Sequence, residues 1–213
     1  MLADSEMMPS VGPAQLDLTT CFPHRICINL ARRPDRWALA QAQFQQHQIE
    51  VARWNAVDGA TIQIPLDWGY LPGAYGCTTS HLEAVRQARA RKYESLLIFE
   101  DDVELHPELR SLFPEFMAQV PGDWDAIYFG GIHRLEPAAA APNVVRLVET
   151  NSTYAYALRR TVFDAFLSIN ERSHALTVKI HQVFFVQSII ANIFRTVCKE
   201  GSIRSNRRRD EWL

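Results

Sequence analysis

The 213-residue sequence lacks any long uninterrupted apolar run. Its most apolar late stretch, residues 183–197, is interrupted by Gln187, Asn192 and Arg195. Such a stretch is too short and too polar to cross a bilayer, and it predicts a buried or amphipathic helix. The sequence also lacks a large excess of charge of either sign. The formal net charge is -2 and the pI is about 6.4, which excludes a whole-protein attraction to nucleic acid or to an anionic membrane.

Cysteines are few and widely spaced. None of the four, Cys21, Cys27, Cys77 and Cys198, belongs to a C-x-x-C pair. This spacing predicts reduced thiols in a cytoplasmic protein rather than a disulfide framework or a zinc site. Residues 1–23 contain acidic residues and prolines but no apolar segment of the signal-peptide type, so we expect them to form a flexible leader.

Several catalytic signatures are also missing. No Gly-Lys-Ser/Thr follows the glycine-containing segment at residues 73–81, which excludes a phosphate-binding P-loop. The sequence has no H-E-x-x-H motif, no Ser-His-Asp order and no internal repeat. The sequence therefore carries none of the motifs that indicate a P-loop NTPase, a zinc protease of the H-E-x-x-H type or a serine hydrolase.

What the sequence does contain is an alternation of apolar runs with helix-forming segments. Runs typical of strands occupy residues 24–30, 50–57, 95–99, 124–129, 144–148 and 153–158. Predicted helices cover residues 34–47, 161–169 and a segment from about Ser80 to Lys92, where Glu83 gives Ser80 a capping-box spacing. Residues 60–75 and 136–142 are predicted loops. This order predicts one α/β domain with a mostly parallel sheet flanked by helices.

The strongest candidate for chemistry is the acidic triplet Glu100-Asp101-Asp102, which directly follows a continuous apolar strand. Ligands of open α/β sheets bind beyond the carboxyl ends of the strands. Carboxylates at that position can hold Mg²⁺ or Mn²⁺ and share the ion with a diphosphate. The alternative is a solvated strand end whose acids cap the next helix, and the triplet alone does not decide between the two.

Two further clusters lie near predicted strand ends. Arg32, Arg33 and Arg36 follow the first strand, where guanidinium groups and a helix N-terminus can bind a phosphate; a solvated basic turn is the alternative. The segment at residues 73–81 brings two glycines and a run of hydroxyls before a helix, which permits close approach of a ligand. His81 could donate to a phosphate or a sugar hydroxyl, although a lone histidine there is more often structural.

Together these clusters resemble glycosyltransferase family 25, the lipopolysaccharide and lipooligosaccharide galactosyltransferases and their collagen-modifying relatives. The matching motifs are I-N-L at 28–30, R-R-x-D-R at 32–36, G-C-x-x-S-H at 76–81 and I-F-E-D-D at 98–102. The segment Y-A-Y-A-L-R-R at 154–160 resembles a later strand and helix of the family. The resemblance covers residues 24–169.

The resemblance implies a GT-A-like, Rossmann-type fold and a metal-dependent hexosyltransferase that uses a UDP-sugar, with galactose as the sugar. Its acceptor would be an oligosaccharide or a lipid-linked glycan, as in lipopolysaccharide biosynthesis. Mn²⁺ or Mg²⁺ would be bound by Asp102 and Asp101, and Asp102 and Glu100 would be the catalytic acids. The residues expected to bind the donor are Asn29, Arg33, Arg36, Ser80 and His81.

The sequence departs from the family after residue 169. Family members carry a Pro-x-Asp-aromatic segment there, with an acid that can serve the acceptor, whereas this chain has N-E-R-S-H-A-L at 170–176 and Glu171 is a weak substitute. Residues 170–213 are predicted to be a divergent, helical and basic tail whose arginines allow at most a peripheral contact with anionic lipid at the inner face of the membrane. The alternatives are a nucleotide-sugar binding module that has lost its base, and a nucleotidyltransferase.

Overall fold

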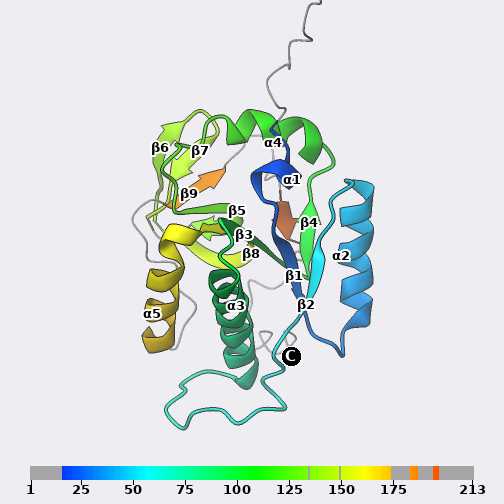
Figure 1. The fold of residues 1–213 in the computed structure, drawn as a ribbon, viewed down its shortest axis with the longest axis vertical. Helices are drawn as coiled ribbons and strands as arrows, with labels where there is room; N and C mark the ends of the chain where they lie inside the picture. Colours follow the sequence, from blue (N-terminus) through cyan, green and yellow to red (C-terminus); the bar gives the residue numbers. More distant parts are fainter. Residues whose placement is uncertain (1–15, 134, 149, 174–182, 187–193, 197–213) are drawn as a thin grey trace, which may run out of the picture.

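The apolar runs of the sequence form a central sheet with helices on both of its faces (Figure 1). The structure, a computed structural model, describes residues 16–133, 135–148, 150–173, 183–186 and 194–196. The eight-stranded sheet has the order β2-β1-β3-β8-β5-β9-β7-β6. Its strands are β1 (Arg25–Asn29), β2 (Ala52–Asn55), β3 (Ser95–Glu100), β5 (Ala126–His133), β6 (Ala138–Ala141), β7 (Val144–Arg146), β8 (Thr150–Arg159) and β9 (Val183–Val186).

The sheet is mixed, but most of its strands share one direction. Strand β1 is parallel to β2 and β3, and β5 is parallel to β9. Strand β8 lies between β3 and β5 and is antiparallel to both, so the two parallel groups point the same way. The carboxyl ends of β1, β2, β3 and β5 therefore meet at one edge of the sheet. A separate antiparallel pair joins β4 (Val103–Leu105) to β10 (Phe194–Thr196).

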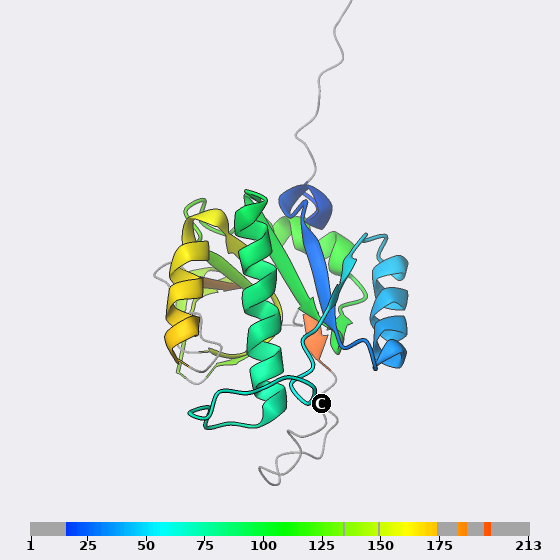
Figure 2. The same cartoon turned by 60° about the horizontal axis from the view of Figure 1, so that its bottom comes forward.

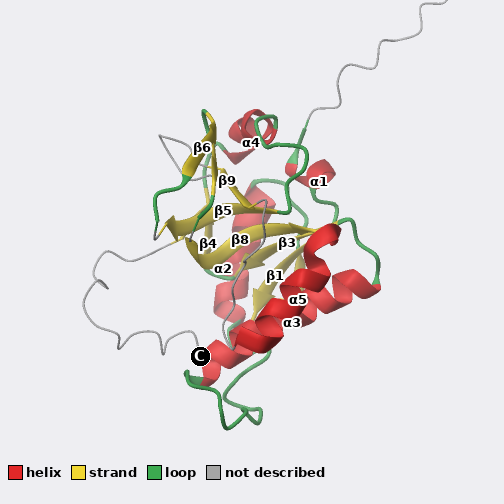
Figure 3. Ribbon diagram, turned by 90° about the vertical axis from the view of Figure 1, so that its left-hand side faces the viewer, coloured by secondary structure: helices red, strands yellow, loops and turns green. Residues whose placement is uncertain are grey.

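Helices cover both faces, as Figure 3 shows: α3 and α5 lie together over one face, with α2 behind the sheet. The helices are α1 (Leu18–Cys21), α2 (Pro34–Gln46), α3 (Pro72–Ala90), α4 (Leu109–Met117), the 3-10 turn η1 (Arg160–Val162) and α5 (Phe163–Ser173). The strand β3 supplies both layers of the core. Leu97 and Phe99 pack with residues of α1, α2 and α4, and Leu96 and Ile98 pack with residues of α3 and α5. A strand buried on both faces explains its continuous apolar run and confirms the predicted α/β class.

Helix α3 begins earlier than the sequence predicted. It starts at Pro72 rather than near Ser80, so Ser80 lies inside the helix and the predicted loop at residues 60–75 ends at residue 71. Pro72 sits at the helix start, where its fixed φ is favourable and its missing N–H costs nothing. The loop between β2 and α3 extends past the base of α3, which Figure 2 brings forward.

Two other predictions were wrong. The alanine-rich segment predicted as a loop forms β6, which pairs with β7. Residues 183–186 and 194–196, predicted to lie in a helix, form β9 and β10. Short apolar runs fit a buried strand as well as a helix, and here pairing with β5, β7 and β4 decides the outcome.

The first described residues belong to the packed domain. Leu18 of α1 is buried and Phe22 is fully enclosed among Phe113, Trp124 and Phe129. These contacts extend the core into the segment that the sequence assigned to the leader. In the part of the chain that the structure describes, no helix has the length and apolarity needed to cross a bilayer.

Candidate functional site at the carboxyl ends of β1 and β3

A cleft lies between α3 and the edge of the sheet where β1 and β3 end. Asn29 is the last residue of β1 and Glu100 the last of β3, and the strand register places Glu100 beside Ile28. The cleft contains about 470 Å³ of open space, part of it continuous with solvent. Its lining residues are Ile28, Leu30, Arg36, Ala56, Val57, Asp58, Gly59, Gly73, Cys77, Ser80, His81, Glu100 and Asp101. Two of the three predicted acids thus line a cavity.

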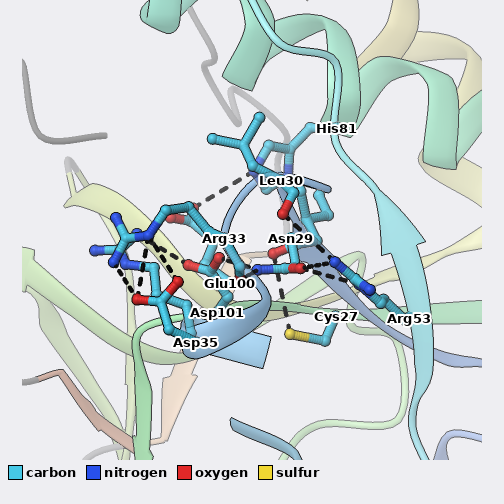
Figure 4. Close-up of polar contacts among 11 residues, drawn as sticks. Cys27, Asn29, Leu30, Arg33, Asp35, Arg53, His81, Glu100 and Asp101 are labelled. Atoms are coloured by element: carbon cyan, nitrogen blue, oxygen red, sulfur yellow. Dashed lines mark hydrogen bonds and ion pairs between the residues drawn. The ribbon is translucent and has the colours of Figure 1, made fainter. Parts of the chain in front are cut away.

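Asp101 is held by a buried polar network centred on Asn29 (Figure 4). The Asn29 Nδ2 group donates to Asp101 Oδ2 at 2.6 Å and to the carbonyl of Arg33 at 3.0 Å. Arg53 donates to Asn29 Oδ1 from the opposite side, at 2.9 and 2.5 Å. Arg36 NH1 pairs with Asp101 Oδ1 at 3.0 Å. Both oxygens of Asp101 therefore have protein partners, and this acid holds Arg36 in the lining of the cleft.

Asp102 has the opposite environment. Its Oδ1 atom is enclosed, with no hydrogen-bond partner among the described residues. Burial, followed by the charge of Glu100, raises the pKa of Asp102 to about 7. Burial raises the pKa of the Cys77 thiol, and the charges of Glu100 and Asp102 raise it further. Asp102 is not among the residues that line the cleft, although Asp101, its neighbour in the chain, is. A buried carboxylate oxygen without a partner favours binding of a cation.

We expect Asp102 to make the metal-free protein less stable as the pH rises. Between the unfolded pKa near 4 and the folded value of about 7, the folded state holds a proton that the unfolded state has lost, so stability falls across that window. Asp102→Asn removes the titrating group. In chelator-treated protein, the variant should melt higher than the wild type at pH 8 and by a smaller margin at pH 5. A margin that does not depend on pH would contradict the shift.

Glu100 belongs to a second network, formed with α3 and β8. The Thr153 hydroxyl donates to Glu100 Oε1 in a short contact. His81 is fully buried; its Nδ1 is 2.8 Å from the Tyr156 hydroxyl and its Nε2 is 3.4 Å from Glu100 Oε1. That Nε2 atom has no hydrogen-bond partner among the described residues. His81 is thus oriented by Tyr156 and faces a carboxylate in the cleft.

Ser80 links helix α3 to the loop that follows β2 through hydrogen bonds of its hydroxyl group. Its hydroxyl donates to the carbonyl of Gly76 at 2.6 Å and accepts from the N–H of Val57 at 2.8 Å. Gly76 lies against the same loop: a Cβ atom there would be 2.5 Å from the Val57 carbonyl oxygen. The glycine and hydroxyl of this motif therefore bring two protein segments together. We had expected them to admit a ligand from the start of a helix, whereas both lie inside α3.

The structure brings together most of the predicted residues. Arg36, Ser80, His81, Glu100 and Asp101 line the cleft. Asn29 lies behind them as the partner of Asp101. Arg33 is not among the lining residues and pairs with Asp35 at 2.7 Å on the surface. Arg32, from the same turn, pairs with Asp58 at 2.7 Å.

Three residues of the two networks, and Cys77 of the cleft wall, were not singled out from the sequence. Arg53 lies on β2, Thr153 and Tyr156 on β8, and Cys77 on α3. Tyr156 and Cys77 stand inside segments that carried the family resemblance, so their positions offered a signal. Nothing in the sequence around Arg53 or Thr153 indicates a role, because their contacts depend on pairing between strands far apart in the chain.

No family model matches the chain. Procollagen galactosyltransferase 2 of Mus musculus is 30% identical over 155 residues, covering 62% of this chain and 25% of that protein. Inactive glycosyltransferase 25 family member 3 of Homo sapiens is 30% identical over 175 residues, covering 71% of this chain and 29% of that protein. The chain thus matches less than a third of the length of these relatives.

Among solved structures, a glycosyltransferase involved in glycosylation of the major capsid of PBCV-1 aligns with a TM-score of 0.49 and 9% identity, over 83% of this chain and 92% of the other. The sequence relatives place the chain among the glycosyltransferases. It belongs to glycosyltransferase family 25.

Proposed function

We propose that this chain binds a UDP-sugar in the cleft between α3 and the β1–β3 edge and transfers the sugar to a glycan acceptor. Family membership supports the class of reaction, and the observation that supports a metal site beside this cleft is the partnerless buried oxygen of Asp102, next to the lining residue Asp101. Galactose is the proposed sugar, by analogy with the relative named procollagen galactosyltransferase 2. An oligosaccharide or lipid-linked glycan, as in lipopolysaccharide biosynthesis, is the proposed acceptor.

The acidic edge fits a hard divalent cation such as Mn²⁺ or Mg²⁺, because these ions take oxygen ligands and Asp102 offers an oxygen with no other partner. Bound there, the ion would supply neutralisation of the charge that develops on a departing diphosphate. Each oxygen of Asp101 already has a protein partner, Asn29 or Arg36, so its proposed contribution is to hold Arg36 toward the phosphates. Ser80 and His81 form the wall opposite.

Glu100 is the carboxylate proposed to act on the acceptor hydroxyl in the cleft. It lines the cavity, and its position is fixed by Thr153 and by the nearby imidazole of His81. A carboxylate held in this way can accept the proton of an acceptor hydroxyl if that hydroxyl comes within hydrogen-bond reach. Arg33 remains a proposed contact to the nucleotide, which would require it to leave Asp35.

The test is a donor screen by UDP release. Purified full chain would be incubated with individual UDP-sugars, with Mn²⁺ or with a chelator, and with glycan acceptors. We expect release from one donor only when the metal is present. No release and no calorimetric binding with any UDP-sugar would overturn the proposal.

A second candidate function is a nucleotide-sugar binding module without turnover. It is favoured by the missing acidic segment after residue 169 and by a relative that is named inactive. Donor binding by calorimetry, with no release of UDP over the acceptors tried, would support this module over the enzyme. Release of pyrophosphate from a nucleoside triphosphate would instead indicate a nucleotidyltransferase.

A further inference from the structure

The cleft wall contains a cluster of three potential metal ligands that differs in chemistry from the acidic edge. Cys77 and His81 stand four residues apart on α3 and therefore share one face of the helix. Glu100 meets them from the end of β3. The Cys77 sulfur, a His81 ring nitrogen and a Glu100 carboxylate oxygen all lie within 4.8 Å of one another. All three residues line the same cavity.

His81 provides an independent indication that this cluster accepts a ligand. Its side chain is fully buried, yet Nε2 has no hydrogen-bond partner among the described residues and faces Glu100 at 3.4 Å. The other nitrogen, Nδ1, is engaged by the Tyr156 hydroxyl at 2.8 Å. A metal-bound histidine typically has its second nitrogen held by such an outer partner, which fixes the ring orientation. Thr153 orients Glu100 in the same manner.

We propose that Cys77, His81 and Glu100 bind a zinc ion, with the fourth coordination position open to the cleft. A thiolate, an imidazole and a carboxylate form a ligand set that suits Zn²⁺, whereas Mg²⁺ and Mn²⁺ prefer oxygen ligands throughout. Neighbouring ligands of a tetrahedral zinc ion are separated by about 3.3–3.8 Å. His81 Nε2 and Glu100 Oε1, 3.4 Å apart, already have this separation. The contraction that binding requires therefore concerns the Cys77 sulfur, which lies within 4.8 Å of a His81 ring nitrogen and a Glu100 oxygen.

A zinc ion bound by Cys77, His81 and Glu100 would inhibit the proposed transfer reaction. It would occupy Glu100 and place an ion in the part of the cleft wall formed by α3. Inhibition by zinc rests on the proposed function, but zinc binding itself does not. Zinc binding is therefore measured in the absence of substrate.

The experiment titrates metal-free full chain with Zn²⁺ by calorimetry and then repeats the titration with Co²⁺ as a spectroscopic probe. We expect one zinc per chain and a thiolate-to-cobalt charge-transfer band in the near ultraviolet. Because zinc would bind the folded state, the melting temperature should rise by roughly 3–6 °C at tenfold excess over Kd. A large excess of Mg²⁺ should leave the cobalt band in place.

Cys77→Ser is the decisive variant, with Cys21→Ser as the matched control. Cys21 is a half-buried free thiol in α1 that is not among the cleft-lining residues. The first change should abolish the cobalt band and weaken zinc binding at least tenfold, and the second should leave both unchanged. His81→Gln should also weaken binding while Cys77 is intact. Equal zinc binding by the wild type and Cys77→Ser, or no binding by a wild type of native melting temperature, would overturn the proposal.

Discussion

Asp102→Asn should abolish metal-dependent sugar transfer. The substitution keeps the size of the side chain but replaces the partnerless carboxylate oxygen with a neutral amide group, which is a poor ligand for a hard cation. Loss of one positioned electrostatic group in an active site lowers kcat by about 10²–10³, and we expect a fall of at least that size here. The measurement is the initial rate of UDP release over a range of Mn²⁺ concentrations.

Asp123→Asn is the control for this change, because Asp123 is exposed and lies before β5, outside the cleft lining. It should retain wild-type rates and metal dependence. The Asp102→Asn protein should remain folded, since the substitution removes a carboxylate that Glu100 and burial disfavour in its charged form. Wild-type rates and unchanged metal dependence in Asp102→Asn would show that the ion, if one is needed, is bound elsewhere.

The location of the acidic edge could be predicted from the sequence, but the separate roles of its acids could not. A continuous apolar run followed by three acids indicates a buried strand that ends at a ligand-binding edge. What distinguishes Asp101 from Asp102 is the set of partners. Asn29 and Arg36 reach Asp101 from β1 and α2, and no described residue donates to Asp102 Oδ1. Sequence spacing carries no information on which acid is left open.

The metal-binding potential of Cys77 likewise could not be predicted from sequence spacing. The wide spacing of the cysteines in the sequence predicts reduced thiols and no zinc site. In the cluster, Cys77 and His81 lie one helical turn apart on α3. The third ligand, Glu100, comes 19 residues after His81 and lies at the end of β3. Such a set becomes visible only when the helix and the strand are packed together.

The boundary of α3 was misplaced because local signals favoured a later start. Ser80 and Glu83 have the spacing of a capping box, and residues 60–75 are rich in glycine, proline and aromatic residues. Tertiary contacts prevail: the Ser80 hydroxyl is bound by the backbone of Gly76 and Val57 and cannot cap a helix. The glycines that allow α3 to approach the segment after β2 are Gly76 and Gly59, which lie just outside the predicted loop.

That close approach predicts a large loss of stability in Gly76→Ala. A Cβ atom at residue 76 would lie 2.5 Å from the Val57 carbonyl oxygen and 2.6 Å from the Gly59 nitrogen, both of them backbone atoms. In a helix, alanine is more stable than glycine by about 1 kcal/mol. Overpacking of this kind costs about 1–3 kcal/mol or more, so the net effect of the substitution is to destabilise the protein. The melting temperature should fall by several degrees.

Gly122→Ala is the matched control, because an added Cβ there meets nothing within 4 Å and its stability should change by less than about 0.5 kcal/mol. The two variants also separate the roles of α3. If Gly76→Ala moves α3 away from Val57, the wall that carries Ser80 and His81 shifts with it, and UDP-sugar binding should weaken even well below the melting temperature. A Gly76→Ala protein with unchanged stability and unchanged donor affinity would show that the helix can retreat without cost, and that its contact with residues 57–59 does not shape the cleft.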